Sequence, residues 1–351
     1  MHKKFIFIAV LAVLVFAGEA CSRRNYDLGI YKSSDGGNSW EQKIKIGKKK
    51  ALATFEILSL ALDPQNSQVI YAGTKDKGLY KSVDGAESWQ NTSLKQGDIT
   101  SIAIDFKDPN IIYLTSYVGD FGKIYKSEDG GNKFEEIYSE THQQIPVYSL
   151  ALDWYDSRII WAGTKKGAVV KSEDSGRNWI VKKWLESEIV QIAISSKDSR
   201  HIIIGTGTDG LIKTEDGGKT WQQINEAFLA KDDKVRSKEK LQVYSLIFAW
   251  SSPGSVYFAS KYQLLKSSDE GKSWQEIKLL TKPQEASLMR IALDSFDSEK
   301  IYLGLDSNIY KSEDGGKNWK VKKFTSGRIS ALVVDPQETS KIYAGIRKPK
   351  E

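Results

Sequence analysis

The sequence predicts an all-β chain of seven repeated four-stranded sheets closed into one ring, and three observations lead to this fold class. A motif of Ser or Thr, any residue, Asp and at least one Gly occurs seven times in 351 residues. An alternating apolar motif, followed by a turn and a short β-branched run, also occurs seven times. Each end of the chain lacks the half-repeat that the other end carries. Together these features are typical of a seven-bladed β-propeller.

The first motif has the chemistry of a tight hairpin between the third and fourth strands of each sheet. It reads YKSSDGGNSW from Tyr31 and YKSEDGGKNW from Tyr310, and successive copies are 42 to 53 residues apart. An aspartate in such a turn accepts hydrogen bonds from backbone amides, and glycine adopts positive φ without a Cβ clash. We therefore expect a structural role, and no catalytic one, for Asp35, Asp84, Asp129, Asp174, Asp216, Asp269 and Asp314.

An aromatic residue ends every copy of this motif. Its large apolar surface is expected to cover the hairpin and open the fourth strand. The seven residues are Trp40, Trp89, Phe134, Trp179, Trp221, Trp274 and Trp319.

The second motif supplies the first two strands of each sheet. ILSLALDPQNSQVIYAGT from Ile57 is one example: SLALD reads as an inner strand and IYAGT as the next strand outwards. Helical periodicity is absent over any useful length, apart from a charged insertion at 225–240. Each unit is thus four antiparallel strands.

The two chain ends predict how the ring closes. The first hairpin motif, at 31–40, has no inner strands before it, and the last inner pair, which ends at Ile346, has no hairpin motif after it. Pairing of the terminal strands would complete the seventh blade and leave no open sheet edge. The sequence therefore predicts one propeller domain at 29–346 and a basic tail at 347–351.

The N-terminus has the layout of a secretory signal. Lys3 and Lys4 precede an uninterrupted apolar run, Phe5 to Ala17, which is short for a membrane-spanning helix. Gly18 to Cys21 resembles a bacterial lipobox, whose cysteine is acylated. We expect a signal peptide at 1–20, a tether at 21–28 and lipidation at Cys21, which would hold the protein at the bacterial cell envelope, facing the periplasm or the cell surface. Ordinary cleavage after Ala20 and an uncleaved anchor remain alternatives.

These repeats resemble the Asp-box or BNR-repeat superfamily, which includes sialidases, xyloglucanase-type glycoside hydrolases, sortilin and photosystem II assembly factors. The resemblance covers nearly all of 29–346, but the motif specifies a blade and no activity. A sialidase is disfavoured, because the Arg-Ile-Pro motif is missing and arginine is sparse. Xyloglucanase-type enzymes use two propellers with a carboxylate from each.

Other catalytic signatures are weak. Beyond the signal there are two histidines, His142 and His201, both expected to be structural or surface residues, although a Ser-His-Asp arrangement stays open. The single cysteine excludes an intramolecular disulfide and a thiolate zinc site. The sequence carries no phosphate loop, EF-hand or histidine cluster, so no metal or cofactor is expected.

A basic loop face is the predicted binding surface. Connections between second and third strands and between blades share the side opposite the hairpin motifs, together with a 117–121 insertion and the 228–240 loop. We expect lysines and arginines to gather there. The candidates are Lys75, Lys77, Lys165, Lys166, Lys182, Lys183, Lys322, Lys323, Arg347 and Lys348, with Lys48, Lys49 and Lys50 nearby.

The function that the sequence favours is a non-enzymatic, membrane-tethered binding or assembly scaffold that presents this face to a protein client or a polyanion. The alternative is a carbohydrate-active module, either a glycan binder or a glycoside hydrolase. Nucleic acid is disfavoured by the export signal, despite the net charge of +6. We expect a monomer.

Overall fold

A computed structural model describes residues 27–47, 50–224, 242–260, 263–280 and 289–349. The predicted signal peptide, the Cys21 lipidation site and most of the tether lie outside these residues. Within them the chain is all β, apart from one 3₁₀ turn, η1 (Leu52–Thr54). No helix in the described ranges is long and apolar enough to cross a membrane.

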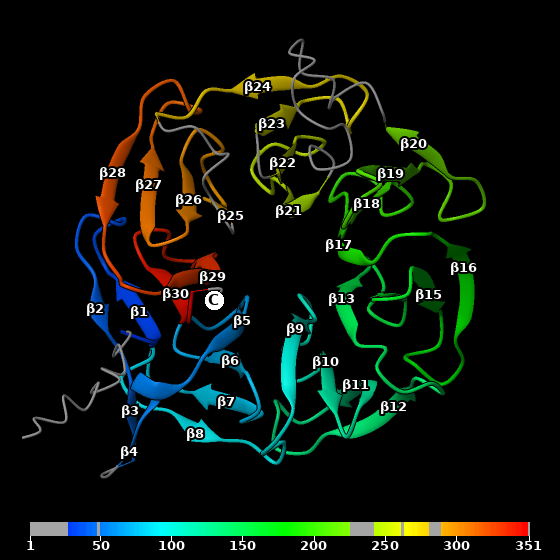
Figure 1. The fold of residues 1–351 in the computed structure, drawn as a ribbon, viewed down its shortest axis with the longest axis horizontal. Helices are drawn as coiled ribbons and strands as arrows, with labels where there is room; N and C mark the ends of the chain where they lie inside the picture. Colours follow the sequence, from blue (N-terminus) through cyan, green and yellow to red (C-terminus); the bar gives the residue numbers. More distant parts are fainter. Residues whose placement is uncertain (1–26, 48–49, 225–241, 261–262, 281–288, 350–351) are drawn as a thin grey trace, which may run out of the picture.

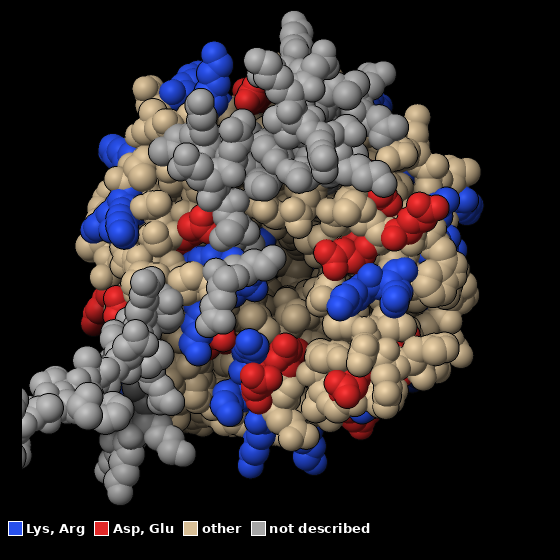
Figure 2. All heavy atoms as spheres, viewed as in Figure 1, with Lys and Arg blue, Asp and Glu red and all other residues tan. Residues whose placement is uncertain are grey.

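Seven four-stranded antiparallel sheets form a ring, which confirms the predicted fold class (Figure 1). The ring surrounds a central hollow, called the channel below (Figure 2). Blade 1 is β5 (Ile57–Leu62), β6 (Ile70–Thr74), β7 (Leu79–Ser82) and β8 (Gln90–Asn91); blade 2 is β9 (Asp98–Ile104), β10 (Ile112–Val118), β11 (Phe121–Ser127) and β12 (Glu135–Ser139); blade 3 is β13 (Val147–Leu152), β14 (Ile160–Thr164), β15 (Ala168–Ser172) and β16 (Ile180–Trp184).

The ring continues in the same order. Blade 4 is β17 (Ile189–Ile194), β18 (Ile202–Thr206), β19 (Leu211–Thr214) and β20 (Gln222–Ile224); blade 5 is β21 (Val243–Phe248), β22 (Val256–Ser260), β23 (Leu264–Ser267) and β24 (Gln275–Ile277); blade 6 is β25 (Met289–Leu293), β26 (Ile301–Leu305), β27 (Asn308–Ser312) and β28 (Lys320–Lys323). Blade 7 is β29 (Arg328–Val334), β30 (Ile342–Arg347), β1 (Gly29–Ser33) and β2 (Glu41–Gln42); β3 (Lys45–Ile46) and β4 (Lys50–Ala51) form a small extra hairpin.

Blade 7 closes the ring as predicted, because both chain ends contribute strands to it. The N-terminal β1 pairs with the C-terminal β30 from Gly29 opposite Ile346 to Ser33 opposite Ile342. The other edge of β30 pairs with β29, so β30 lies inside the sheet. Both β1 and β30 are therefore paired along both edges, so neither of these terminal strands has an unpaired edge.

The second strand of each blade forms the core between blades. In β6 and its equivalents in blades 3 to 6 every residue is buried, whereas outer strands such as β28 are exposed. Gly163 shows why a glycine recurs in these strands: a Cβ there would lie 2.2 Å from Cγ2 of Ile189 in the next blade. Glycine therefore permits the close approach of neighbouring blades.

Each hairpin motif, called the Asp box below, makes one repeated set of hydrogen bonds. In the first box, Asp35 Oδ1 accepts from the Ser39 amide at 2.8 Å, and the Ser33 hydroxyl donates to Asp35 Oδ1 at 2.8 Å while accepting from the Gly37 amide at 2.8 Å. The equivalent aspartate accepts from the amide four residues later in all seven boxes. The bonds from Ser39, together with that from Ser33, lower the pKa of Asp35 to about 2.

The aromatic residues of the boxes tie neighbouring blades together. Trp89 is fully buried, and its Nε1 donates to the Lys43 carbonyl at 3.1 Å. Trp179 and Trp319 donate in the same way to carbonyls of the preceding blade. The boxes therefore act as circumferential contacts as well as turns.

Candidate functional site

The ring has two chemically different sides. Asp boxes and the turns after the inner strands share one side, the box side. Connections between second and third strands, and between one blade and the next, share the other, the loop side. The C-terminal end of β30 lies on the loop side next to the channel, and Figures 1 and 2 view the ring from there.

Six of the sequence-predicted basic residues lie at loop-side connections. Lys75 and Lys77 lie between β6 and β7, Lys165 and Lys166 lie between β14 and β15, Arg347 ends β30, and Lys348 follows it. All six are at least partly exposed. They remain candidate binding residues by position.

The other four lysines do not lie in connections. Lys182 and Lys183 are inside the outermost strand β16, and Lys322 and Lys323 are inside the outermost strand β28. Lys322 Nζ also donates to the Asn38 carbonyl at 3.0 Å, across the junction with blade 7. The fourth strands extend further than the sequence pattern indicated, so these side chains lie on the outer wall. The 228–240 loop, Lys48 and Lys49 lie outside the described residues.

Two of the predicted residues, Lys75 and Lys348, meet at Glu56, which precedes β5. Lys75 Nζ lies 3.6 Å from Glu56 Oε1, and the Lys348 amide donates to Glu56 Oε2 at 3.2 Å. Opposite charges so close attract each other, and only the Lys75 side chain of this pair is largely exposed. The Glu56 carboxylate thus accepts one backbone hydrogen bond and faces one lysine.

Two arginines that the sequence analysis did not select lie next to this group. Arg328 begins β29 directly opposite Arg347 of β30, and its Nε donates to the Lys348 carbonyl at 3.1 Å. Arg328 is only 8% exposed. Like charges directly opposite each other on neighbouring strands are unfavourable.

Arg347 has an unused hydrogen-bond donor. Its Nε is buried and has no hydrogen-bond partner among the residues that the structure describes. Burial and the neighbouring Arg328 lower the pKa of the Arg347 guanidinium, while Glu56 partly opposes this shift. A buried charged donor without a partner costs free energy that an acceptor from a ligand would recover.

Arg290, in the inner strand β25, is the third arginine near Arg328 and Arg347. Its Nε donates to the Ser330 carbonyl of blade 7 at 2.9 Å, and its Nη1 donates to the Tyr244 carbonyl of blade 5, so it lies along the channel wall. Burial and the nearby Arg347 lower its pKa. We call Arg290, Arg328 and Arg347 the arginine cluster. Figure 2 shows basic atoms on the side of the central hollow where β29, β30 and β5 lie, with acidic atoms close by.

Comparison of the repeats could have identified Arg290. The positions in the same strand register of the other inner strands carry no charge: they are Ser59, Ser101, Ser149, Gln191, Ser245 and Ala331. A single cation at one of seven otherwise uncharged channel positions is a functional signal, because burying it without a role would be costly.

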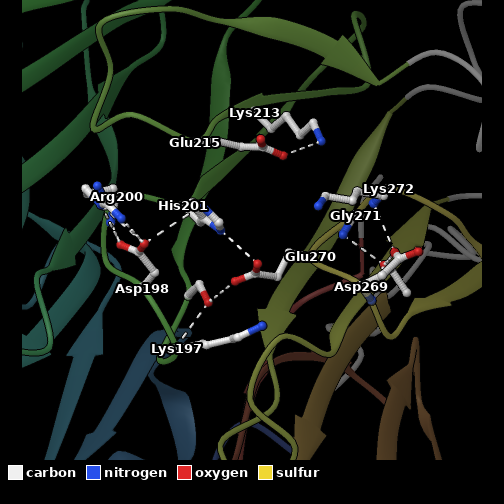
Figure 3. Close-up of polar contacts among 12 residues, drawn as sticks. Lys197, Asp198, Arg200, His201, Lys213, Glu215, Asp269, Glu270, Gly271 and Lys272 are labelled. Carbon is white, nitrogen blue, oxygen red and sulfur yellow. Dashed lines mark hydrogen bonds and ion pairs between the residues drawn. The ribbon is translucent and has the colours of Figure 1, made fainter.

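A second polar cluster joins blades 4 and 5 on the box side (Figure 3). The Ser195 hydroxyl donates to Glu270 Oε1 at 2.9 Å, and His201 Nδ1 lies 2.8 Å from Glu270 Oε2. Glu270 replaces the first glycine of its box and adopts φ 60°. Ser195 stands where five other inner strands end in aspartate.

The geometry of this cluster does not fit nucleophilic catalysis. A serine nucleophile needs the histidine as its direct hydrogen-bond partner, with the carboxylate behind the histidine. Here the carboxylate of Glu270 lies between the hydroxyl and the imidazole. His142 shares a hydrogen bond of 3.0 Å with the hydroxyl of the neighbouring Thr141. Among the described residues, no group of three or more His, Cys, Asp and Glu could hold a metal ion.

Two family models match parts of the chain. The model described as "Photosynthesis system II assembly factor YCF48" matches residues 180–337, and the model described as "Sortilin, neurotensin receptor 3" matches residues 29–148. The predicted resemblance to BNR-type propellers is therefore confirmed. A search of the curated proteins finds no match to the sequence.

Solved structures share the fold. The GH74 xyloglucanase from Xanthomonas campestris is similar with a TM-score of 0.67 and 17% identity, over 83% of this chain and 51% of the enzyme. YCF48 bound to a D1 peptide is similar with a TM-score of 0.61 and 14% identity, over 84% of this chain and 94% of that protein. YCF48 from Cyanidioschyzon merolae gives 0.61 and 11%, over 83% and 95%. The chain thus spans about half the length of the xyloglucanase and nearly all of the YCF48 proteins.

Proposed function

We propose that this protein is a non-enzymatic binding scaffold, which holds an anionic segment of a protein client at the loop-side mouth of the channel. The observation that carries the proposal is the buried, unpartnered Nε of Arg347 beside Arg328 and Arg290. A carboxylate from a client would accept from Arg347 and offset the repulsion between the guanidinium groups. Arginine suits this task because its planar donors match a carboxylate in two places.

A protein client is favoured over other polyanions by the size and position of the cluster. The three arginines lie at one channel mouth, so they offer a compact site for one or two carboxylates, as at the end of a peptide chain. A long polyanion would need charge spread around the ring. The fold-level similarity to YCF48 bound to a D1 peptide agrees with this choice.

The carbohydrate-active alternative rests on the similarity to the GH74 xyloglucanase. This chain supplies one propeller, about half of that enzyme's length. A hydrolase of that kind would need a second propeller to complete the cleft. A glycan-binding role without hydrolysis would need free polar groups, whereas Glu56 is already engaged by Lys75 and Lys348.

Titration calorimetry at two salt concentrations distinguishes these functions. The ligands are a short peptide with acidic residues and a free C-terminal carboxylate, the same peptide with neutral side chains and an amidated end, and xyloglucan oligosaccharides. We expect binding of the acidic peptide only, weakened at least several-fold at high salt because the contact is electrostatic. Binding of the oligosaccharide alone would contradict the proposal.

We also propose that acylated Cys21 holds the scaffold at the membrane. The apolar run before this only cysteine supports the idea. Cys21→Ser should release the protein from the membrane fraction or leave an unprocessed precursor, because one residue carries the anchor. Unchanged membrane association of the variant, together with no lipid label on the wild type, would contradict it.

A further inference from the structure

Exposed aromatic rings collect at the other mouth of the channel, on the box side. The turns that follow the inner strands of blades 2, 3 and 5 carry Phe106, Trp154 and Trp250, which are 43%, 37% and 44% exposed. Large aromatic side chains seldom stay this exposed together without a partner. These three residues are called the aromatic mouth below.

The rings of the aromatic mouth contact one another across the channel. Trp250 packs against Phe106 with centroids 5.3 Å apart and against Trp154 with centroids 5.1 Å apart. Blades 2 and 5 are not neighbours in the ring. The contact between Phe106 and Trp250 therefore spans the opening, and Trp250 is the middle ring of the three.

A cavity of about 300 Å³ lies beside these rings, between the inner strands of blades 2 to 5. Its wall is largely apolar and includes Ala103, Ala151, Ile192 and Leu246. An apolar cavity of about 150 Å³ already binds benzene. The present cavity is therefore large enough for a ring system such as indole.

The polar side chains in the wall are engaged, which limits the chemistry of a ligand. Gln191 Oε1 accepts from the Leu246 amide at 3.0 Å. Asp105 Oδ1 accepts from the Lys107 amide and Asp153 Oδ1 from the Tyr155 amide, both at 2.8 Å. The wall thus contains two carboxylates, and the Oδ1 atom of each is already bonded to an amide of its own turn. A neutral or cationic apolar group is favoured there, and an anion is repelled.

Trp250 is held by ring contacts with its two aromatic neighbours. Trp154 is held by a bond from its Nε1 to the Ile194 carbonyl at 2.9 Å, and the backbone of Phe106 accepts from Gln65 at 2.9 Å. Trp250 follows Ala249, where most other blades have the aspartate that binds its own turn. Within the described ranges, its indole makes ring contacts and no hydrogen bond.

We propose that the aromatic mouth is a second ligand site, which takes a flat apolar ring without negative charge into the cavity beside these three rings. The site differs from the arginine cluster in both position and chemistry. One mouth of the channel selects an anion, whereas the other selects an uncharged or cationic ring. The ring belongs either to a free small molecule or to an aromatic side chain of a peptide.

Ligand-observed NMR and calorimetry with three indole compounds test the proposal. Indole and tryptamine should bind with one site per protein, and indole-3-acetate should bind at least ten-fold more weakly because of its charge. A capped peptide with one tryptophan distinguishes the sources: a side-chain ligand gives tighter binding of this peptide than of free indole. Absence of binding by indole and tryptamine at millimolar concentration would overturn the proposal, as would equal affinity for indole-3-acetate.

Two variants and a control locate the binding. Ala151→Phe fills the cavity and should reduce the affinity for indole at least ten-fold. Trp250→Ala, at an exposed position that should fold normally, removes the central ring and should also weaken binding several-fold. Phe296→Ala removes an aromatic ring that is 72% exposed on the same side but lies outside the cavity wall, and should change nothing. Unchanged binding in both test variants would overturn the site.

Discussion

Replacement of Glu270 by glycine sets two opposing effects against each other at the junction of blades 4 and 5. Glu270 adopts φ 60°, so glycine would relieve about 1–2 kcal/mol of strain. Glycine also makes the unfolded chain more flexible, which offsets about 0.4–1 kcal/mol of this stabilisation. The loss of the bond from Ser195 to the carboxylate costs about 1.5–3 kcal/mol, and the contact with His201 is lost as well. We therefore expect Glu270→Gly to destabilise the protein by about 1–3 kcal/mol.

Urea unfolding followed by circular dichroism at neutral pH measures this effect. Glu270→Gln is the matched variant, because it keeps the backbone conformation and an acceptor for Ser195 but removes the charge facing His201. We expect the unfolding midpoint to fall from the wild type to Glu270→Gln and further to Glu270→Gly. A midpoint for the glycine variant equal to or above that of the wild type would show that backbone strain dominates and that the cluster does not hold the blades together.

Three further predictions concern the ring itself. Deletion of 342–351 removes β30 from the middle of blade 7, so it should abolish cooperative unfolding and increase aggregation. Deletion of 349–351 should leave the urea-unfolding midpoint unchanged. Equal effects of the two deletions would contradict closure of the ring by β30. Hydrogen bonds lower the pKa of Asp35 and Asp314 from the ordinary 3.8 to about 2. The stability that these carboxylates add is therefore complete above pH 4 and is lost as the pH falls towards 2. A urea-unfolding midpoint that stays constant from pH 5 to 2 would contradict this. Trp89→Ala empties a fully buried site and should cost about 3–5 kcal/mol by urea unfolding, and a loss below 1 kcal/mol would contradict its role between blades.

The sequence was sufficient to predict the architecture because the fold is built from local signals that repeat. Every Asp box specifies a hairpin within ten residues, and seven copies specify the number of blades. The closure by β1 and β30 followed from the incomplete repeats at the two ends. Such inferences need only the order of strands along the chain, without side-chain geometry.

The sequence was less informative about the binding surface, because position on a blade depends on where each strand ends. The extension of β16 and β28 placed Lys183 and Lys323 on the outer wall instead of in connections. The arginine cluster draws Arg290 from one blade and Arg328 from the next, and only the circular arrangement shows that they are close. Trp250 was likewise inconspicuous, because its contacts with Phe106 cross the channel.

The affinity of the acidic peptide for variants of the arginine cluster tests the central claim most directly. Arg328→Met with Arg347→Met removes two charges of the cluster, and Lys182→Gln with Lys183→Gln removes two charges of the outer wall. With thermal unfolding of both double variants measured in parallel, the account predicts at least ten-fold weaker binding and a smaller salt dependence for the arginine variant, and unchanged binding for the lysine variant. Equal affinity of the folded arginine variant and the wild type would contradict the claim that this protein binds an anionic client at the loop-side mouth of its channel.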